Sequence, residues 1–186
     1  MLEFILQKDK DIILFLNNLG SEQWDWLWLA ITKQFNWIPL FVFVFYLIIK
    51  SFGWKRGGFI ILFMILLVAF SDQFTNLIKN TVTRLRPNND VSINNQLRIF
   101  ITPQSYSFYS GHAATSTIFS VFVVLLLKEK WKYIYLILLF PLVFSYSRLY
   151  LGVHFLTDIL SGILAGTLLA NLFFIGYQKL EKRLFK

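Results

Sequence analysis

Five long apolar segments dominate this sequence. A helix needs about 20 apolar residues to cross the hydrocarbon core of a membrane, and the segments that meet this requirement are residues 33–52, 57–79, 109–127, 131–147 and 155–177. Hydrophobic residues make up 56% of the chain, and the mean hydropathy is +0.59. Both values exceed what a soluble globular domain requires. The sequence therefore predicts an all-α integral membrane protein, a polytopic transmembrane helix bundle with five spans.

The chain of 186 residues has room for one domain. We expect a single membrane domain over residues 1–186, with a transmembrane core over residues 33–186. Its longest connection, residues 88–107, is rich in Asn, Gln, Ser and Pro and is expected to form an outer loop. Loops of this length are often functional lids, and a solvated connector is the alternative.

Residues 1–32 contain no clear span, because charges interrupt every apolar run. Trp24, Trp26 and Trp28 are typical of a membrane interface. We interpret this N-terminal region as interfacial helices, with an irregular sixth span as the alternative.

Small residues recur in the last apolar segment. Gly162 and Gly166 are four residues apart, and Ala170 follows one turn later. This spacing lets helix backbones approach closely. We expect it to serve packing inside the bundle rather than a dimer contact.

Positive charge gathers in two loops and in the C-terminal tail. The cations there are Lys50, Lys55, Arg56, Lys128, Lys130, Lys132, Lys179, Lys182, Arg183 and Lys186. The positive-inside rule places them in the cytoplasm, and this topology accounts for the net charge of +8 better than nucleic-acid binding does. The polar stretches near residues 79–87 and 147–158 then face away from the cytoplasm. Because cysteine is absent from the sequence, disulfides and thiolate chemistry are excluded.

Two cations stand at the end of the second expected span. Lys79 and Arg86 are seven residues apart, close to two helical turns, and share one face if the helix continues. Pro87 disfavours helical geometry at Arg86, so the helix is expected to end there. An ammonium and a guanidinium together suit an anion with several oxygens, such as phosphate. Interfacial snorkelling is the alternative, and it is the interpretation we give to Arg84.

A second polar cluster lies between the fourth and fifth spans. Ser147 and Arg148 precede His154, and Asp158 follows His154 by four residues. This spacing predicts that Asp158 lies one helical turn from His154 on the same face. A carboxylate there would accept the Nδ1 proton and leave Nε2 with a free lone pair. Such a histidine is a nucleophile or a base, and an ordinary helix pair is the alternative.

The other histidine follows a short turn before the third span, in the sequence Ser110-Gly111-His112. Backbone N–H groups at a helix N-terminus and a serine hydroxyl can cradle an anion. His112 then stands where it could protonate a leaving group, and a capping or interfacial histidine is the alternative.

The order of these motifs resembles the type 2 phosphatidic acid phosphatase family. Lys79, Arg86 and Pro87 match its first motif; Ser110, Gly111 and His112 match its second; Ser147, Arg148, His154 and Asp158 match its third. One departure is Tyr109, where the family usually has proline. It affects the rigidity of the turn more than the chemistry, since proline has no reactive group.

The resemblance implies a hydrolase that needs no metal or other cofactor and works through a phosphohistidine. His154 would attack phosphorus, Asp158 would orient its imidazole, and His112 would protonate the departing oxygen. The phosphoryl oxygens would be held by Lys79, Arg86, Arg148, Ser110 and the Gly111 amide. Fixed cations suit a phosphoryl-transfer transition state, which needs positioning and charge neutralisation.

The position of the motifs at the outer ends of the spans, between helices that acyl or prenyl chains can approach, favours a lipid phosphate or diphosphate as substrate. By resemblance to small bacterial members of the family we expect a bacterial inner membrane as the location, and the distribution of cations places the site on the extracytoplasmic side. Undecaprenyl diphosphate is the first candidate; lipid A phosphate, phosphatidylglycerol phosphate and phosphatidic acid remain open. The alternative class is a lipid-phosphate binding or transport protein without activity. A vanadium haloperoxidase is a further alternative, but those enzymes are soluble and much longer. A zinc site on the two histidines and Asp158 is another, but the spacing lacks a recognised ligand triad.

Overall fold

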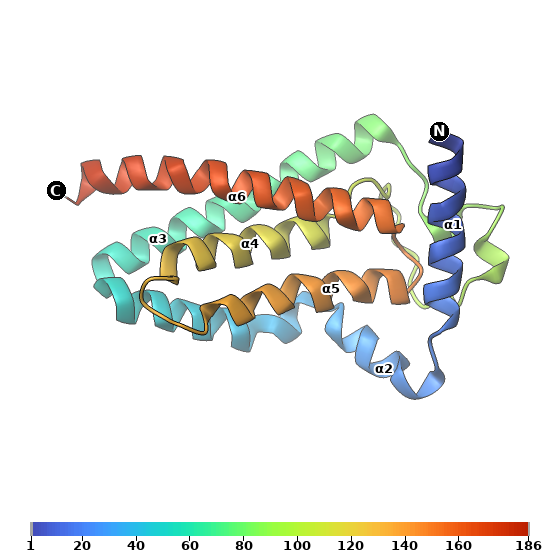
Figure 1. The fold of residues 1–186 in the computed structure, drawn as a ribbon, viewed down its shortest axis with the longest axis horizontal. Helices are drawn as coiled ribbons and strands as arrows, with labels where there is room; N and C mark the ends of the chain where they lie inside the picture. The colour runs from blue at the N-terminus through green and yellow to red at the C-terminus, as the bar shows by residue number, and fades with distance from the viewer. Residues whose placement is uncertain (1, 186) are drawn as a thin grey trace.

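The computed structural model describes residues 2–185, and the regular secondary structure in this range is all helical, without a β-strand (Figure 1). The α-helices are α1 (Leu2–Asn18), α2 (Glu22–Ile31), α3 (Ile38–Val82), α4 (Gly111–Leu127), α5 (Leu139–Tyr150) and α6 (Leu156–Leu184). Short 3-10 turns are η1 (Gln34–Trp37), η2 (Pro87–Asn89), η3 (Asn94–Gln96) and η4 (Ile134–Leu138). The predicted all-α class is confirmed.

Helix α3 is two helical arms joined at Gly53. This glycine has φ +74° and ψ 169°, a conformation that other residues rarely adopt. The chain therefore folds back on itself, and the two arms form a hairpin whose turn lies at the end of the bundle nearest the C-terminus (Figure 1). The arms correspond to the first two expected spans, and the turn falls within the gap left between them in the sequence.

Helix α4 lies inside the bundle and packs most extensively against α6 (Figure 1). The small residues of α6 explain this closeness. A Cβ at Gly162 would lie 2.6 Å from the Ser110 carbonyl oxygen, and one at Gly166 would lie 2.6 Å from that of Ala114. The predicted packing role of these glycines is confirmed. It also brings the first turns of both helices together, where the Ser110 N–H donates to the Asp158 carbonyl at 3.0 Å.

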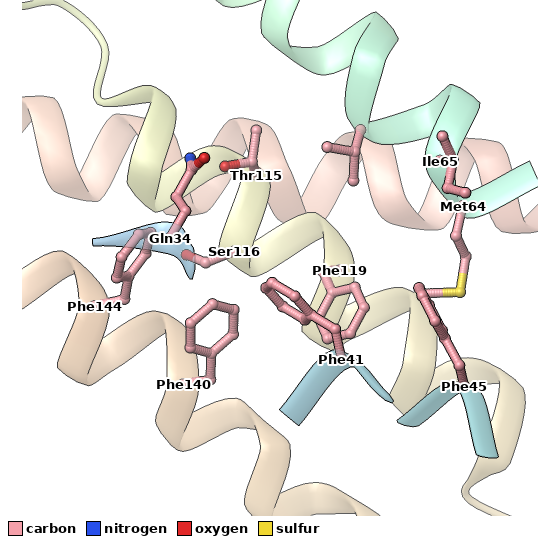
Figure 2. A pocket seen from close by; sticks show the side chains of 11 residues that line it. Gln34, Phe41, Phe45, Met64, Ile65, Thr115, Ser116, Phe119, Phe140 and Phe144 are labelled. Carbon is pink, nitrogen blue, oxygen red and sulfur yellow. The ribbon is translucent and has the colours of Figure 1, made fainter. Parts of the chain in front are cut away.

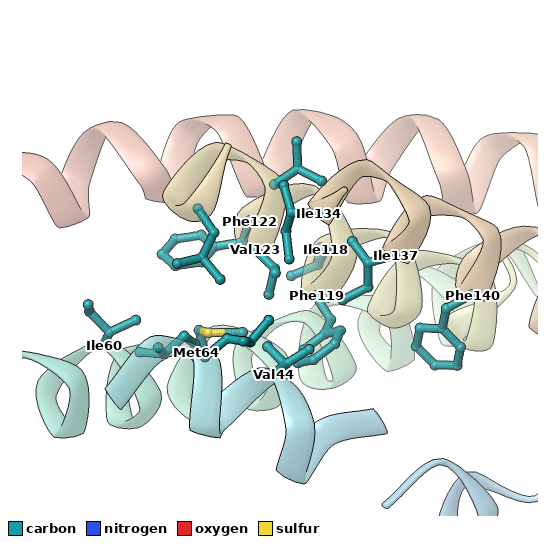
Figure 3. Packing of buried hydrophobic residues seen from close by; sticks show 14 of the residues in the cluster. Val44, Ile60, Met64, Ile118, Phe119, Phe122, Val123, Ile134, Ile137 and Phe140 are labelled. Atoms are coloured by element: carbon teal, nitrogen blue, oxygen red, sulfur yellow. The ribbon is translucent and has the colours of Figure 1, made fainter. Parts of the chain in front are cut away.

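The main hydrophobic core fills the space between α3, α4, η4 and α5 (Figure 3). Ile48, Ile60, Ile118, Phe122 and Val123 are fully buried in it. Burial of such side chains is the main favourable contribution to this packing, about 1.5–3 kcal/mol for each.

The outer surface of the bundle is apolar as well. On α6, Leu160, Leu164, Leu168 and Leu172 follow one another at four-residue intervals, and each is more than half exposed. Soluble proteins rarely expose such a stripe. Residues 34–89 and helix α6 are long and apolar enough to cross a membrane, whereas residues 111–127 and 134–150 form shorter apolar helices. The chain is an integral membrane protein.

The N-terminal helix α1 runs across the end of the bundle where α5 ends and α6 begins (Figure 1). Two polar side chains on α1 are buried there, Asp9 and Asn17. The Asn17 amide donates to the Tyr150 carbonyl at 2.7 Å and to the Arg98 carbonyl at 3.2 Å. Polar contacts therefore hold α1 on this end of the bundle.

Candidate active site

A polar cavity of about 490 Å³ opens between α3, α4 and α5 at the end of the bundle that α1 crosses. Five of the residues singled out in the sequence line it: Lys79, Arg86, Gly111, His112 and Arg148. They come from all three sequence motifs. The fold thus brings together cations that are far apart along the chain, and the local cation excess makes the cavity suitable for an anion.

Arg86 reaches this cavity from an extended segment rather than from α3. The helix ends at Val82, and Thr83 adopts a left-handed conformation with φ 52°, so the expectation that it continues to Arg86 is wrong. The Arg86 side chain is buried and held by Ser105, with Nε donating to the carbonyl at 2.6 Å and Nη2 to Oγ at 2.9 Å. Ser105 belongs to the long outer loop, which therefore shapes the site.

His154 contacts Arg86 directly. The imidazole is almost fully buried in the link between α5 and α6, and its Nε2 lies 3.0 Å from Arg86 Nη1. A guanidinium has only donors, so Nε2 must be the acceptor and the proton of a neutral ring sits on Nδ1. Burial, reinforced by the charges of Arg86 and Arg148, holds the pKa of His154 well below its usual value of 6.5. The ring is neutral at neutral pH and keeps a lone pair on Nε2.

Asp158 faces the other nitrogen of the ring. Its Oδ2 lies 3.3 Å from His154 Nδ1 and accepts a hydrogen bond from the Phe155 N–H at 2.9 Å. The expected arrangement of both residues on one helix face is wrong in detail: His154 precedes α6, whose N-cap is Phe155, and Asp158 is the third residue of the helix. Ser107 Oγ also donates to Oδ2.

Arg84 is not an interfacial snorkelling residue, contrary to our interpretation of the sequence. Its Nη1 donates to Asp158 Oδ1 at 2.7 Å, and its Nη2 donates to Asp9 Oδ2, also at 2.7 Å. Its guanidinium stacks on the Phe155 ring, 4.0 Å from the centroid. Arg84 therefore connects α1 to the carboxylate beside His154.

Other motif residues divide between the cavity and the scaffold. Arg148 Nη1 donates to Thr32 Oγ1, while its buried Nε has no hydrogen-bond partner within the described residues. Ser110 caps α4, with Oγ accepting from the Ala113 N–H at 3.4 Å. Ser147 Oγ donates to the Phe144 carbonyl at 2.6 Å. The two serines support the backbone that carries Gly111, His112 and Arg148.

A second, apolar cavity of about 260 Å³ lies next to the polar one. Gln34, Val68 and Thr115 line both. Aromatic rings from α3, α4 and α5 surround the rest (Figure 2): Phe41, Phe45, Phe119, Phe140 and Phe144. Ile65 lines this cavity and is 54% exposed, so the cavity reaches the apolar outer surface of the bundle.

The sequence model of the PAP2 superfamily matches residues 57–182, which is more than half of the chain and includes all three motifs. The chain belongs to the PAP2 superfamily. It is therefore a phosphoric ester hydrolase. Its candidate active site is the cation-lined cavity, which His154 does not line itself but meets through its contact with Arg86.

Characterised relatives of this PAP2 protein act on different phosphates. A lipid A 4′-phosphatase of Bacteroides thetaiotaomicron is 31% identical over 99% of this chain and 83% of its own length. An undecaprenyl-diphosphatase of Sulfolobus acidocaldarius is 32% identical, over 73% of this chain and 60% of its own length. A crystal structure of a transmembrane PAP2-type phosphatidylglycerolphosphate phosphatase from Bacillus subtilis shares the fold. Its TM-score is 0.71 at 23% identity, covering 97% of this chain and 89% of that one.

Several residues that shape this PAP2 site were not singled out in the sequence. Ser105 and Ser107 lie in the long loop whose composition predicted only a lid or a connector. Asp9 and Thr32 belong to the N-terminal region that we interpreted as interfacial. Asp9 stands in the charged run from Lys8 to Asp11, so the sequence does not distinguish it as a residue that becomes buried.

Proposed function

We propose that this PAP2 enzyme hydrolyses a phosphate ester of a membrane lipid through a phosphohistidine on His154. The observation that carries the proposal is the line of contacts from Arg86 through His154 to Asp158 at the edge of the polar cavity. A buried imidazole with its proton directed at a carboxylate and its lone pair directed at a phosphate-binding guanidinium is arranged for nucleophilic attack.

In the first step, Nε2 of His154 attacks phosphorus while the bond from phosphorus to the lipid oxygen breaks. His112 gives its proton to the departing oxygen. Lys79, Arg86, Arg148 and the Gly111 N–H neutralise the charge on the phosphoryl oxygens. Asp158 stabilises the imidazolium that forms, and Ser110 holds the turn that presents Gly111.

In the second step, His112 removes a proton from a water molecule as the water oxygen attacks phosphorus. The bond from phosphorus to Nε2 breaks, inorganic phosphate leaves, and His154 returns to its neutral form. Proton balance is restored, because His112 lost one proton in the first step and gains one in the second. The step requires no metal ion, since the fixed cations supply the charge neutralisation.

The apolar cavity supports a lipid substrate. It shares Gln34, Val68 and Thr115 with the cationic cavity, and eight of its eleven lining residues are hydrophobic (Figure 2). A phosphorylated headgroup in the polar part would place its acyl or prenyl chain among these rings. A water-soluble ester would leave this apolar surface without a partner.

Lipid A phosphate is the first candidate among the lipids. The lipid A 4′-phosphatase relative aligns with nearly the whole chain, whereas the undecaprenyl-diphosphatase relative aligns with 73% of it. This comparison moves undecaprenyl diphosphate, the first candidate from sequence, to second place. The location we propose is the inner membrane of a bacterium, with the site on the extracytoplasmic side, as the distribution of cations predicts.

The test is phosphate release by the purified protein in detergent from lipid A, undecaprenyl diphosphate, phosphatidylglycerol phosphate and phosphatidic acid. We expect the highest kcat/KM on lipid A. A preference of about tenfold or more for undecaprenyl diphosphate would reverse the order of the two candidates. Release from none of these lipids, with retained binding of them, would favour the lipid-binding alternative.

A further inference from the structure

A chain of hydrogen bonds connects the N-terminal helix to the proposed catalytic carboxylate. Asp9 on α1 is 2% exposed, and its Oδ2 accepts from Arg84 Nη2 at 2.7 Å. Nη1 of the same guanidinium donates to Asp158 Oδ1 at 2.7 Å. Asp158, which is fully buried, in turn faces His154 Nδ1 with its other oxygen.

We infer that Arg84 and Asp9 are positioning residues for Asp158, and that α1 is therefore a working part of the active site. This inference rests on the proposed function, in which Asp158 orients and stabilises His154. It concerns residues outside the three motifs. Asp9 also lies outside residues 57–182, the part that the family model matches.

The two oxygens of Asp158 have separate partners. Oδ2 faces Ser107 Oγ, the Phe155 N–H and His154 Nδ1, whereas Oδ1 is held by Arg84. Rotation of the carboxylate about its bond to Cβ would move Oδ2 away from the imidazole. Because Arg84 fixes Oδ1, it opposes that rotation and keeps Oδ2 directed at the ring.

Arg84 is itself held from several sides. Its Nη1 also donates to Thr157 Oγ1 at 2.8 Å, and Phe155 supports the guanidinium plane. Asp9 contacts Thr157 as well, accepting from its N–H at 3.0 Å and from its hydroxyl. Asp9 therefore fixes Arg84 and the first turn of α6, the two groups that determine where Asp158 lies.

A purely structural anchor would not need these charges. Buried ion pairs seldom stabilise a fold more than well-packed apolar side chains of similar size do. Elsewhere α1 already meets the bundle through Ile13, which is fully buried, and through the Asn17 hydrogen bonds. The charged pair of Asp9 and Arg84 lies instead where Arg84 connects α1 to Asp158.

Arg84 also contributes to the electrostatic environment of His154. The charged and titratable groups that act on this imidazole are Arg86, Arg148, Lys79 and Arg84 as cations, together with Asp158 and His112. Positive charge beside the imidazole disfavours its protonated form, so Arg84 helps to hold the pKa of His154 down. Removal of the Arg84 charge would raise the pKa of His154. The Asp158 oxygen that Arg84 no longer holds would raise this pKa as well.

The experiment compares Asp9→Asn, Arg84→Gln and Arg84→Lys in the full-length protein in detergent, with p-nitrophenyl phosphate as substrate. Asp11→Asn is the matched control, because Asp11 lies on the same helix and is exposed, and its side-chain hydrogen bonds and ion pairs within the described residues are with Gln7 and Lys8 alone. We expect kcat to fall about 10- to 100-fold in Asp9→Asn and Arg84→Gln, as for other lost positioning contacts, with KM changed less than about threefold. Arg84→Lys should recover part of the loss, and the control should match wild type.

Two further measurements separate positioning from stability. In Arg84→Gln the acid limb of kcat/KM should move to higher pH by about one unit, whereas Arg84→Lys, which keeps the charge, should leave it in place. In an Asp158→Asn background, Arg84→Gln should cost less than about twofold, because the carboxylate through which it acts is gone.

Wild-type turnover of the aryl phosphate tests the proposed function, and the variants test this inference independently. If the wild type is active and Asp9→Asn and Arg84→Gln match Asp11→Asn, the positioning role is overturned. A full additive loss in the Asp158→Asn background overturns it as well. If Arg84→Gln does not purify as folded protein, Asp9→Asn and Arg84→Lys decide the question. Asp9→Asn preserves the shape of the original side chain, and Arg84→Lys preserves its charge.

Discussion

Arg86, which lines the polar cavity, donates a hydrogen bond from Nη1 to Nε2 of His154 at 3.0 Å. A phosphoryl oxygen entering the cavity competes with Nε2 for this donor, and charge favours the phosphoryl oxygen. Transfer of the hydrogen bond to phosphate frees the Nε2 lone pair as phosphorus arrives. In the proposed mechanism, Arg86 thus couples substrate binding to exposure of the nucleophile.

Replacement of His154 by Ala should abolish turnover, with a loss of at least about 10³-fold, because the covalent route disappears. The measurement is steady-state phosphate release together with trapping of labelled protein after an alkaline quench, since a phosphohistidine survives in alkali. Wild type should carry label, and His154→Ala should carry none. Retention of half the wild-type rate would contradict the assignment of the nucleophile.

The pH dependence follows from the lowered pKa of His154. A group whose pKa is depressed in the folded enzyme stays neutral down to that pKa, so the nucleophile is present throughout the neutral range. We expect kcat/KM to fall only when the pH drops well below 6.5, the usual value of histidine. A profile of kcat/KM on p-nitrophenyl phosphate from acid to neutral pH checks this. An acid limb centred above 6.5 would show that burial and cations do not control the ring.

His112 should matter most for substrates with a poor leaving group. His112→Ala should slow hydrolysis of an alkyl phosphate by about 10²-fold or more, but slow the first step on an activated aryl phosphate far less, because that oxygen leaves without a proton. Since the second step also uses His112, labelled phosphoenzyme should accumulate in this variant on the aryl substrate. Equal first-step losses on both substrates would contradict its role as the acid.

The sequence predicted those parts of the molecule that depend on local patterns. Apolar length located both arms of α3, α4 and α6, whereas the fourth expected segment, residues 131–147, contains η4 and its α-helix spans Leu139–Tyr150. The spacing within each motif identified Lys79, Arg86, His112 and Arg148, which line one cavity. The end of α3 at Val82 was missed, because the left-handed residue that ends the helix is Thr83 rather than glycine or asparagine, the residues typical of this position.

The contacts around Asp158 were missed for a different reason. Arg84 meets Asp9 across 75 residues and Asp158 across 74. The first pairing depends on how α1 crosses the bundle and the second on how the segment after α3 meets α6, and periodicity within one helix encodes neither. An isolated buried charge is costly, so Asp9 needs a partner once it is buried. Only the three-dimensional structure identifies this partner as Arg84.

Close packing of α4 and α6 should be sensitive to a single methyl group. A Cβ at Gly166 would lie 2.6 Å from the Ala114 carbonyl oxygen, a backbone atom that moves only if the helices separate. Gly166→Ala should therefore destabilise the protein by about 1–3 kcal/mol. Gly176→Ala on the same helix is the control. Apart from its chain neighbours and the adjacent backbone of α6, no atom of the described residues lies within 4 Å of the added Cβ. Thermal unfolding in detergent compares the two, and equal midpoints would contradict the packing account.

The apolar cavity offers a way to separate lipid binding from chemistry. Ile65 stands where this cavity meets the outer surface, and Ile65→Trp should obstruct it (Figure 2). Uniform binding of the lipid chain would be lost, so kcat/KM on a lipid phosphate should fall about tenfold, chiefly through KM. Hydrolysis of p-nitrophenyl phosphate, which lacks a chain, should be unchanged.

Leu62→Trp is the matched control for this substitution. Leu62 is 55% exposed on the same arm of α3, close to the 54% of Ile65, but it is not among the residues that line the cavity. A tryptophan there adds the same bulk to the lipid-facing surface without entering the cavity, so both substrates should be hydrolysed at wild-type rates. If the two variants lose lipid activity equally, the effect belongs to the outer surface, and the lipid chain does not occupy the cavity. If Ile65→Trp also slows the aryl phosphate, the obstruction reaches the polar cavity, and the division of the site into a headgroup part and a chain part is wrong.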